Sequence, residues 1–418
     1  MTTEPTDRSL PGARLGDQHL RRLVVGEGLA AVVDALFLVW LTLYVLELSE
    51  PGIATGLVLV AVALPRAALL LPAGVLVDRL GPARVAATAC WLRVAVLLAL
   101  GALVAFTSPS VTTVALLAGV LGAADAAYFP AALALIPAVV LTAKLSRVNA
   151  LVQGAESGGD LVGPAVAAGA IAAVGFDVTL GVIAATAALA AIALSPLIRV
   201  LRRGEDTRGD AGPDTIDREQ LSSVRALGAG LRYAWHEPLV RGMLAAVALI
   251  NITVVGPVLV GGAVLADQRL GGAGSLGVVL SGFGAGSLVG SFIAGWRPPA
   301  RRGWTVVGGV AAIGGGVAGL AAVTHVVAAT AVVSVVGVGS ASLGVVIVAT
   351  LQERVPKQLR GRVLSLVVLA TVAFDPFSYV IAGVLLPYGT TTLFLVCGGA
   401  VLACAGLVAA NPAIRALR

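Results

Sequence analysis

Apolar blocks of about twenty residues alternate with short polar stretches along nearly the whole chain. A helix needs roughly 20 mostly apolar residues to cross a bilayer, and cutting the sequence at its charged, proline-rich and polar clusters leaves twelve such blocks. The pattern predicts an all-α polytopic membrane protein with twelve transmembrane helices. We expect the spans near 23–46, 53–77, 85–106, 111–134, 149–174, 178–198, 240–266, 275–296, 304–324, 327–351, 363–386 and 390–410.

The one long polar stretch, 199–238, divides the spans into two groups of six. We therefore expect an N-terminal six-helix half at 23–198 and a C-terminal six-helix half at 239–411. The first part of the central loop is linker-like, whereas the part from Ile216 to Trp235 has the apolar spacing of a helix that lies along a membrane surface. The tails are expected at 1–22 and 412–418.

The charges predict how the chain is oriented. Only 12% of residues are charged, about half the share usual in soluble domains, and the polar first twenty residues lack the apolar region of a cleavable signal peptide. All but three of the 28 lysines and arginines fall in the tails and loops on one side. The positive-inside rule makes that side cytoplasmic, with both termini on it. We expect a multi-pass protein of the cell inner (plasma) membrane.

Several other classes of protein are disfavoured. The net charge of +6 follows from the loop charges, so a nucleic-acid partner is not expected. The three cysteines lie within predicted spans and the three histidines are scattered, so neither a disulfide framework nor a metal site is predicted. The chain has no Walker A lysine and no G-x-S-x-G nucleophile motif. We expect neither an enzyme nor a cofactor.

The two halves resemble each other weakly. Three pairs of matching residues are separated by 212 to 216 positions: Arg147 and Arg362, Pro164 and Pro376, and Gly74 and Gly290. A nearly constant offset indicates a duplicated six-helix unit. Duplicated helical halves with a substrate path between them are typical of secondary transporters.

The loop at 74–84, GVLVDRLGPAR, resembles the signature loop of the major facilitator superfamily, G-x-x-x-D-R-x-G-x-R-R, with Ala83 as its one departure. The matching residues are Gly74, Asp78, Arg79, Gly81 and Arg84. Gly159, Gly163 and Pro164 in the fifth span are similar to the antiporter motif of that superfamily, G-x-x-x-G-P. Together the motifs resemble the twelve-span bacterial multidrug and macrolide efflux branch, which implies the superfamily's fold and drug:proton antiport.

The signature loop also has a physical interpretation. We expect Asp78 to lie where the eleventh helix begins. A carboxylate beside a helix N-terminus gains about 0.3 to 1 kcal/mol from the helix dipole. Pairing with Arg360 or Arg362 would latch the cytoplasmic side shut. The alternative is a loop whose charges only fix the orientation of the chain.

Seven charged residues fall deep within predicted spans, although a charge at the bilayer centre costs roughly 3 kcal/mol. The candidates for proton or cation coupling are Asp34, Glu156, Asp160 and Asp375, and their potential charge partners are Arg66, Arg93 and Asp125. Carboxyl groups in a partly dry cavity can bind and release protons near neutral pH. The alternative is that Arg66 and Arg93 neutralise Asp34, Asp125 and one of the fifth-span acids as fixed structural pairs.

Asn149, Gln153, Glu156 and Asp160 follow one helix face, which we expect to line a central cavity. Further candidates for the cavity wall are Phe37, Tyr44, Asn251 and Thr371. The predicted function is proton-coupled efflux of lipophilic or cationic small molecules by a monomer in the bilayer. The alternatives are an exporter or flippase of a native amphiphile, such as a siderophore or lysophospholipid, and a facilitator that is not coupled to protons.

Overall fold

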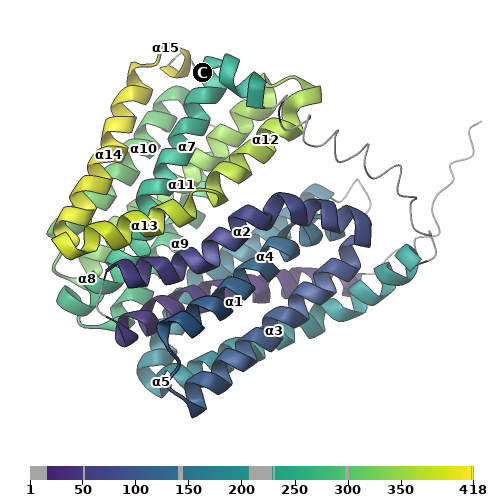
Figure 1. The fold of residues 1–418 in the computed structure, drawn as a ribbon. Helices are drawn as coiled ribbons and strands as arrows, with labels where there is room; N and C mark the ends of the chain where they lie inside the picture. Colours follow the sequence, from purple (N-terminus) through teal and green to yellow (C-terminus); the bar gives the residue numbers. More distant parts are fainter. Residues whose placement is uncertain are drawn as a thin grey trace, which may run out of the picture.

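The chain forms helices throughout the part described by the structure, a computed structural model covering residues 17–49, 52–139, 145–206, 228, 231–296, 301–415 and 417. The helices gather into an N-terminal and a C-terminal bundle (Figure 1). The N-terminal bundle consists of α1 (Asp17–Leu48), α2 (Ile53–Leu80), α3 (Pro82–Phe106), α4 (Val111–Val139) and α5 (Leu145–Asp206). The C-terminal bundle consists of α7 (Pro238–Gly256), η2 (Pro257–Gly261), α8 (Gly262–Arg269), α9 (Ala273–Trp296), α10 (Arg302–Gly319), η3 (Leu320–Ala322), α11 (Val326–Arg354), α12 (Lys357–Val372), α13 (Asp375–Leu385), η4 (Leu386–Tyr388), α14 (Thr390–Ala410) and α15 (Pro412–Arg415).

Eleven helical segments of the described chain are long and apolar enough to cross a membrane. One of them, α5, contains two of the predicted spans, 149–174 and 178–198. Gly175 lies between them with φ 84° and ψ 176°, a conformation that glycine adopts without steric cost. The twelve-span, all-α architecture predicted from the sequence is therefore confirmed.

Two spans of the C-terminal half are assembled from shorter pieces. In the first, α7 passes through the π-helical segment η2, which begins at Pro257, into α8. In the second, α12 ends at Val372, and α13 starts at Asp375 with Pro376 in its first turn. Proline has no amide hydrogen to donate and its ring clashes with the preceding turn, so a helix tends to break where it occurs.

The chain outside the spans agrees only partly with the expected boundaries. Helix α1 begins at Asp17, within the expected tail at 1–22, and α5 continues to Asp206, beyond the expected end at 198. Most of the expected surface helix at 216–235 lies outside the described residues, although 231–236 is helical. The short α15 occupies part of the expected C-terminal tail.

Small residues let α5 pack closely on α1 within the N-terminal half. A Cβ atom added to Gly159 would lie 2.9 Å from Ala31 Cβ, and one added to Gly163 would lie 2.6 Å from Ala35 Cβ. Both distances are too short for a larger side chain. The antiporter-type glycines thus mark a helix contact, in the manner of small residues spaced by four in other membrane helices.

The two halves meet towards the end of the bundle where α2 begins. A Cβ added to Gly56 of α2 would lie 2.6 Å from the carbonyl oxygen of Tyr379 in α13, and one added to Gly284 of α9 would lie 2.6 Å from Leu161 Cα in α5. Towards the other end, which carries Gly81, a Cβ atom added to Gly154 or to Gly295 would have no neighbouring heavy atom within 4 Å. The halves are therefore closely packed at one end and separated at the other (Figure 1).

Candidate functional site

A polar cavity of about 640 Å³ lies in the N-terminal half, bounded by α1, α2, α4 and α5. Its volume is typical of sites for small molecules. The charged and polar side chains on its wall are Glu27, Asp34, Arg66, Asp125, Tyr128, Gln153, Glu156 and Asp160. Apolar side chains complete the wall, among them Phe37, Leu38, Val62, Phe129 and Leu133. The cavity thus combines an excess of carboxyl groups with aromatic and aliphatic surface.

Arg93 of α3 joins two of these carboxyl groups from behind the cavity. Its side chain is buried, its Nη2 forms an ion pair with Asp34 Oδ1, and its Nε lies 3.0 Å from Asp125 Oδ1. The Asp34 side chain is 45% exposed and the Asp125 side chain 17% exposed. Asp34 therefore connects a buried cation to the open space of the cavity.

The surroundings of Arg93 hold its guanidinium in place. The guanidinium carbon lies 5.7 Å from the centre of the Tyr128 ring. An aromatic ring attracts a cation that lies over its face. The adjacent space between α1, α3, α4 and α5 is only about 10 Å³ and is lined mainly by alanine, valine and leucine side chains. A charge removed from water in this way is stabilised mainly by its carboxylate partners, so Arg93, Asp34 and Asp125 depend on one another.

Glu27 is a buried member of the site that the sequence analysis did not identify. Only 5% of the residue is exposed, and its Oε1 accepts a 2.9 Å hydrogen bond from the Tyr128 hydroxyl. Glu27 lies two helical turns before Asp34 on the same face of α1, a spacing that could have revealed it. Its burial depends on how α1 packs against α4, which carries Tyr128.

The polar stripe of α5 follows the cavity wall. Gln153, Glu156 and Asp160 all line the cavity, and Gln153 Nε2 donates a 3.1 Å hydrogen bond to Glu156 Oε2. The side chain of Asn149, the first residue of the stripe, lies outside the described part of the structure. Among the described residues, no lysine or arginine forms a salt bridge with Glu27, Glu156 or Asp160.

Several residues expected at the cavity occupy other places. Tyr44 packs in an aromatic core, with its ring centre 4.7 Å from that of Trp40 and 5.3 Å from that of Phe176. Asn251 and Thr371 donate to backbone carbonyls of their own helices, those of Val247 and Val368. None of the three lines the 640 Å³ cavity.

The remaining deep acid, Asp375, also lies away from this cavity wall. It begins α13 in the C-terminal half, where the helix dipole favours a carboxylate. Arg66 of α2 is near enough to attract the Asp375 carboxylate electrostatically and also attracts Asp125. Arg66 therefore interacts electrostatically with an acid of each half.

The signature loop forms the tight connection between α2 and α3. Gly81 has φ 87°, its amide donates to Val77 O at 2.9 Å, and Pro82 starts α3. The side chains of Asp78, Arg79 and Arg362 are exposed. No ion pair joins Asp78 to Arg362, while the side chain of Arg360 lies outside the described residues. The expected Asp78–Arg362 latch is therefore not formed in this conformation, which agrees with the separation of the halves at this end.

Residues 23–374 match the sequence profile of the Major Facilitator Superfamily. The chain belongs to this superfamily. It is a multi-pass membrane transporter. Over 389 residues it is 26% identical to the uncharacterized MFS-type transporter y4rN of Sinorhizobium fredii (strain NBRC 101917 / NGR234), with 90% of each chain covered.

Solved structures of other transporters share the fold of this MFS chain. A peptide transporter POT in complex with sulfate superposes with a TM-score of 0.73 at 14% identity, covering 95% of each chain. A variant of the nucleoside transporter NupG gives a TM-score of 0.71 at 13% identity, covering 94% of this chain and 99% of the other. At these identities the similarity extends to the fold alone.

The described residues include no group of three or more histidine, cysteine, aspartate or glutamate side chains arranged to hold a metal ion. The acids of the cavity are spread along its wall instead.

Proposed function

We propose that this MFS transporter exports cationic, amphiphilic small molecules in exchange for protons, working as a monomer in the inner membrane. The observation that carries the proposal is the charge of the cavity. Five carboxyl groups, those of Glu27, Asp34, Asp125, Glu156 and Asp160, face one lining arginine, Arg66, and one arginine behind the wall, Arg93.

This excess of acids requires neutralisation from outside the protein. Carboxylates without a cation partner are costly within a bilayer, so the cavity without substrate favours bound protons. A cationic substrate supplies the same compensation. Protons and substrate therefore compete for the cavity, and that competition is the elementary requirement of an exchange mechanism.

Asp34 is the acid best placed to respond when a proton and a substrate cation replace each other in the cavity. Its carboxylate contacts Arg93 on one side and the cavity on the other. Protonation of Asp34, or its contact with a substrate cation, weakens its attraction to Arg93 and leaves the guanidinium to Asp125 on α4. Occupancy of the cavity is thereby coupled to the interaction between α1, α3 and α4.

The apolar part of the wall favours an amphiphilic cation over a small ion. Phe37 and Phe129 supply aromatic faces, and Leu38, Val62 and Leu133 supply aliphatic surface. Aromatic faces attract organic cations, by about 0.5 to 2 kcal/mol each. The same excess of acids argues against an anionic substrate. A cationic drug or a cationic native amphiphile is therefore a better candidate substrate than a siderophore or a lysophospholipid.

The direction of transport rests on orientation. The positive-inside rule places the separated end of the halves, which carries Gly81, in the cytoplasm. In the present conformation the acids of the cavity would then receive substrate from the cell interior. The resemblance to efflux transporters agrees with this direction.

The test is gradient-driven uptake of a lipophilic fluorescent cation into inverted membrane vesicles that contain the protein. An acidic vesicle interior should drive uptake by the wild type, and Asp34→Asn should abolish the response to the gradient while substrate binding is retained. Glu156→Gln and Asp160→Asn test whether the two α5 acids also contribute to the response of uptake to the gradient. Asp177→Asn is the matched control, because Asp177 is exposed on α5 beyond Gly175 and outside the cavity.

Equal gradient responses from the wild type and Asp34→Asn would remove Asp34 from the coupling mechanism. Uptake that ignores the gradient in every protein would favour a facilitator. Failure of the wild type to bind any organic cation, measured separately in detergent, would contradict the proposed substrate class.

A further inference from the structure

Arg66 is a charged residue of the cavity wall that has no ion-pair partner in the present conformation. It lies near the middle of α2 and lines the 640 Å³ cavity. None of the ion pairs found among the described residues includes it. A charge at the middle of a span is costly unless it is paired or hydrated. The proposed exchange uses the acids of the cavity and leaves Arg66 without a role of its own.

Asp375 lies on the face of α13 that is turned towards α2. Asp375, Tyr379 and Gly383 follow one another at spacings of four residues, so they share one side of the helix. A Cβ atom added to Gly383 would lie 3.2 Å from the carbonyl oxygen of Gly52. One added to Gly56 would lie 2.6 Å from the carbonyl oxygen of Tyr379. The side of α13 that carries Asp375 therefore packs on α2 across the junction of the two halves (Figure 1).

The directions of the two helices bring Arg66 and Asp375 to neighbouring levels. The earlier residue of α2 contacts the later residue of α13, so the helices run antiparallel. Towards the end that carries Gly81, Arg66 lies ten residues beyond Gly56, which is about 15 Å along the helix. In the same direction Asp375 lies four residues beyond Tyr379, about 6 Å. Helical side chains tilt towards the N-terminus of their own helix, so these two side chains tilt towards each other.

Electrostatics and hydrogen bonding agree with this placement. Arg66 attracts the Asp375 carboxylate, and the charges of both residues act on the Tyr379 side chain. The start of α13 is fixed within the C-terminal half, because the Gly256 amide of α7 donates a 2.7 Å hydrogen bond to Ser378 Oγ. Movement of the C-terminal half therefore carries Asp375 with it.

A proline adjoins each of the two charges. Pro65 precedes Arg66 within α2, and Pro376 follows Asp375 in the first turn of α13. Sharp bends of helices occur mainly at proline. Both charges are thus placed where their helices can adjust when the halves move.

We propose that Arg66 and Asp375 form an ion pair between the halves when the separated end closes, and that this pair stabilises the closed conformation. Closure turns the halves about the packed contact at Gly56. Arg66 and Asp375 are the charges of α2 and α13 nearest to that contact, so they meet early in the movement. The pair depends on neither the proposed substrate nor proton coupling, and each proposal can fail alone.

The experiment is distance measurement by electron paramagnetic resonance on the full-length protein in lipid nanodiscs, with spin labels attached after Gly154→Cys and Gly295→Cys. Both glycines are exposed, one on α5 and one on α9, at the separated end, so the distance between the labels distinguishes open from closed molecules. The wild-type background should populate both distances. Arg66→Gln and Asp375→Asn should each reduce the ratio of closed to open molecules about tenfold, near the lower end of the range for hydrogen bonds to charged groups. The protein without introduced cysteines measures background labelling, since its three native cysteines are buried.

Exchanging the two charges separates pairing from the loss of a charge. Arg66→Asp combined with Asp375→Arg should restore most of the closed population that Arg66→Gln loses. Arg66→Asp combined with Asp177→Arg is the matched control, because it has the same net charge but places the new arginine at an exposed position of α5. It should not restore the closed population. Thermal unfolding checks that each variant is folded.

An unchanged ratio of closed to open molecules in Asp375→Asn would overturn the proposal, as would equal ratios in the two double variants. A wild type that shows only the open distance, with and without an organic cation, would also overturn it. Weaker cation binding by Arg66→Gln at an unchanged ratio would show that Arg66 acts on the substrate and not between the halves. The distance measurement needs neither a substrate nor a pH gradient, so failure of the proposed exchange does not affect it.

Discussion

The hydroxyl of Tyr128 on α4 donates a 2.9 Å hydrogen bond to the carboxylate of Glu27 on α1, between residues 101 positions apart in the chain. The same tyrosine ring lies beside the guanidinium of Arg93. One side chain thus contacts both the most buried acid of the cavity and the cation that joins Asp34 to Asp125.

Tyr128→Phe should lower the free energy of unfolding by about 1 to 3 kcal/mol, because Glu27 would keep its burial but lose its hydrogen-bond donor. Denaturant unfolding in detergent measures the change. Tyr388→Phe, at a side chain that is 73% exposed, is the matched control and should leave stability unaltered. Equal losses in the two variants would mean that the Tyr128–Glu27 bond contributes little.

Arg93→Gln should destabilise the protein by about 3 kcal/mol, the lower end of the range for breaking a buried ion pair, because Asp34 is partly exposed. Asp125→Asn in the same chain should recover part of the loss by removing a carboxylate that Arg93 no longer neutralises. Thermal unfolding of the single and double variants gives the comparison, with the exposed Arg241→Gln as the control. Simple additivity of the two substitutions would show that Arg93 and Asp125 act independently.

Gly81→Ala should destabilise the connection between α2 and α3 by roughly 1 to 2 kcal/mol, because an L residue with a Cβ is strained at φ 87°. Gly74→Ala on the same helix should be neutral or stabilising, since no heavy atom lies near its Cβ position and alanine is the better helix former. Proteolysis or thermal unfolding distinguishes the two. A larger loss for Gly74→Ala would contradict this explanation of the signature loop.

Binding of an organic cation should weaken as the pH falls, since protons compete with it for the acids of the cavity. Protons on those acids remove negative charge, so the apparent dissociation constant rises towards acid pH. Fluorescence titration of the detergent-solubilised protein at several pH values measures the effect. Glu156→Gln should flatten the dependence, whereas Asp177→Asn should reproduce the wild type. A pH-independent dissociation constant in the wild type would argue against competition.

The twelve spans could be predicted from the sequence because the thickness of the bilayer fixes their length. The break at Gly175 and the interruption beside Pro376 follow from local backbone chemistry, which the sequence also displays. The deep charges were recognisable as well. Pairing of the two arginines with Asp34 and Asp125 was one of the two alternatives, but which arginine meets which acid could not be predicted, because the contacts of Arg93 depend on how α1, α3 and α4 pack.

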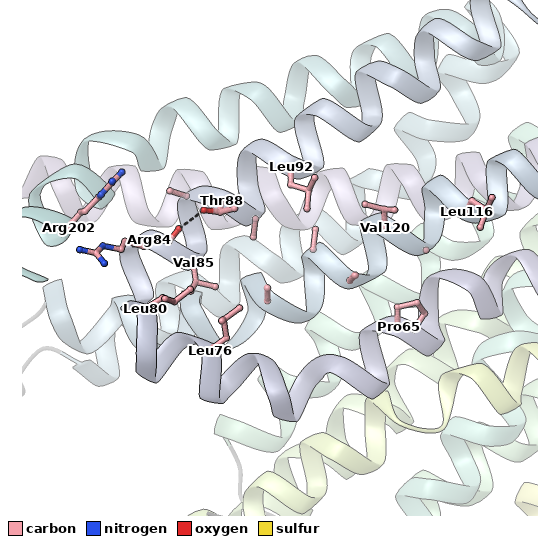
Figure 2. Close-up of a pocket in the computed structure, with 16 residues that line it drawn as sticks. Pro65, Leu76, Leu80, Arg84, Val85, Thr88, Leu92, Leu116, Val120 and Arg202 are labelled. Atoms are coloured by element: carbon pink, nitrogen blue, oxygen red, sulfur yellow. Dashed lines mark hydrogen bonds between the residues drawn. The ribbon is translucent and has the colours of Figure 1, made fainter. Parts of the chain in front are cut away.

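Other parts of the site depend on tertiary structure in the same way. Tyr44 was expected at the cavity, but its ring stacks on Trp40 in the core, a choice that helical periodicity alone does not determine. The hollow of about 700 Å³ between α2, α3 and α4 was not predicted, since its wall combines single faces of three helices with one arginine from a fourth (Figure 2).

The one-sided placement of the cavity charges has an electrical consequence. The residues that line the 640 Å³ cavity lie between positions 27 and 160, so all of them belong to the N-terminal half. A membrane potential exerts force on charges within the bilayer, worth about 2.3 kcal/mol per elementary charge for each 100 mV. The membrane potential therefore acts on the cavity charges through the N-terminal half. The number of protons bound to the acids of that half sets the size of the force.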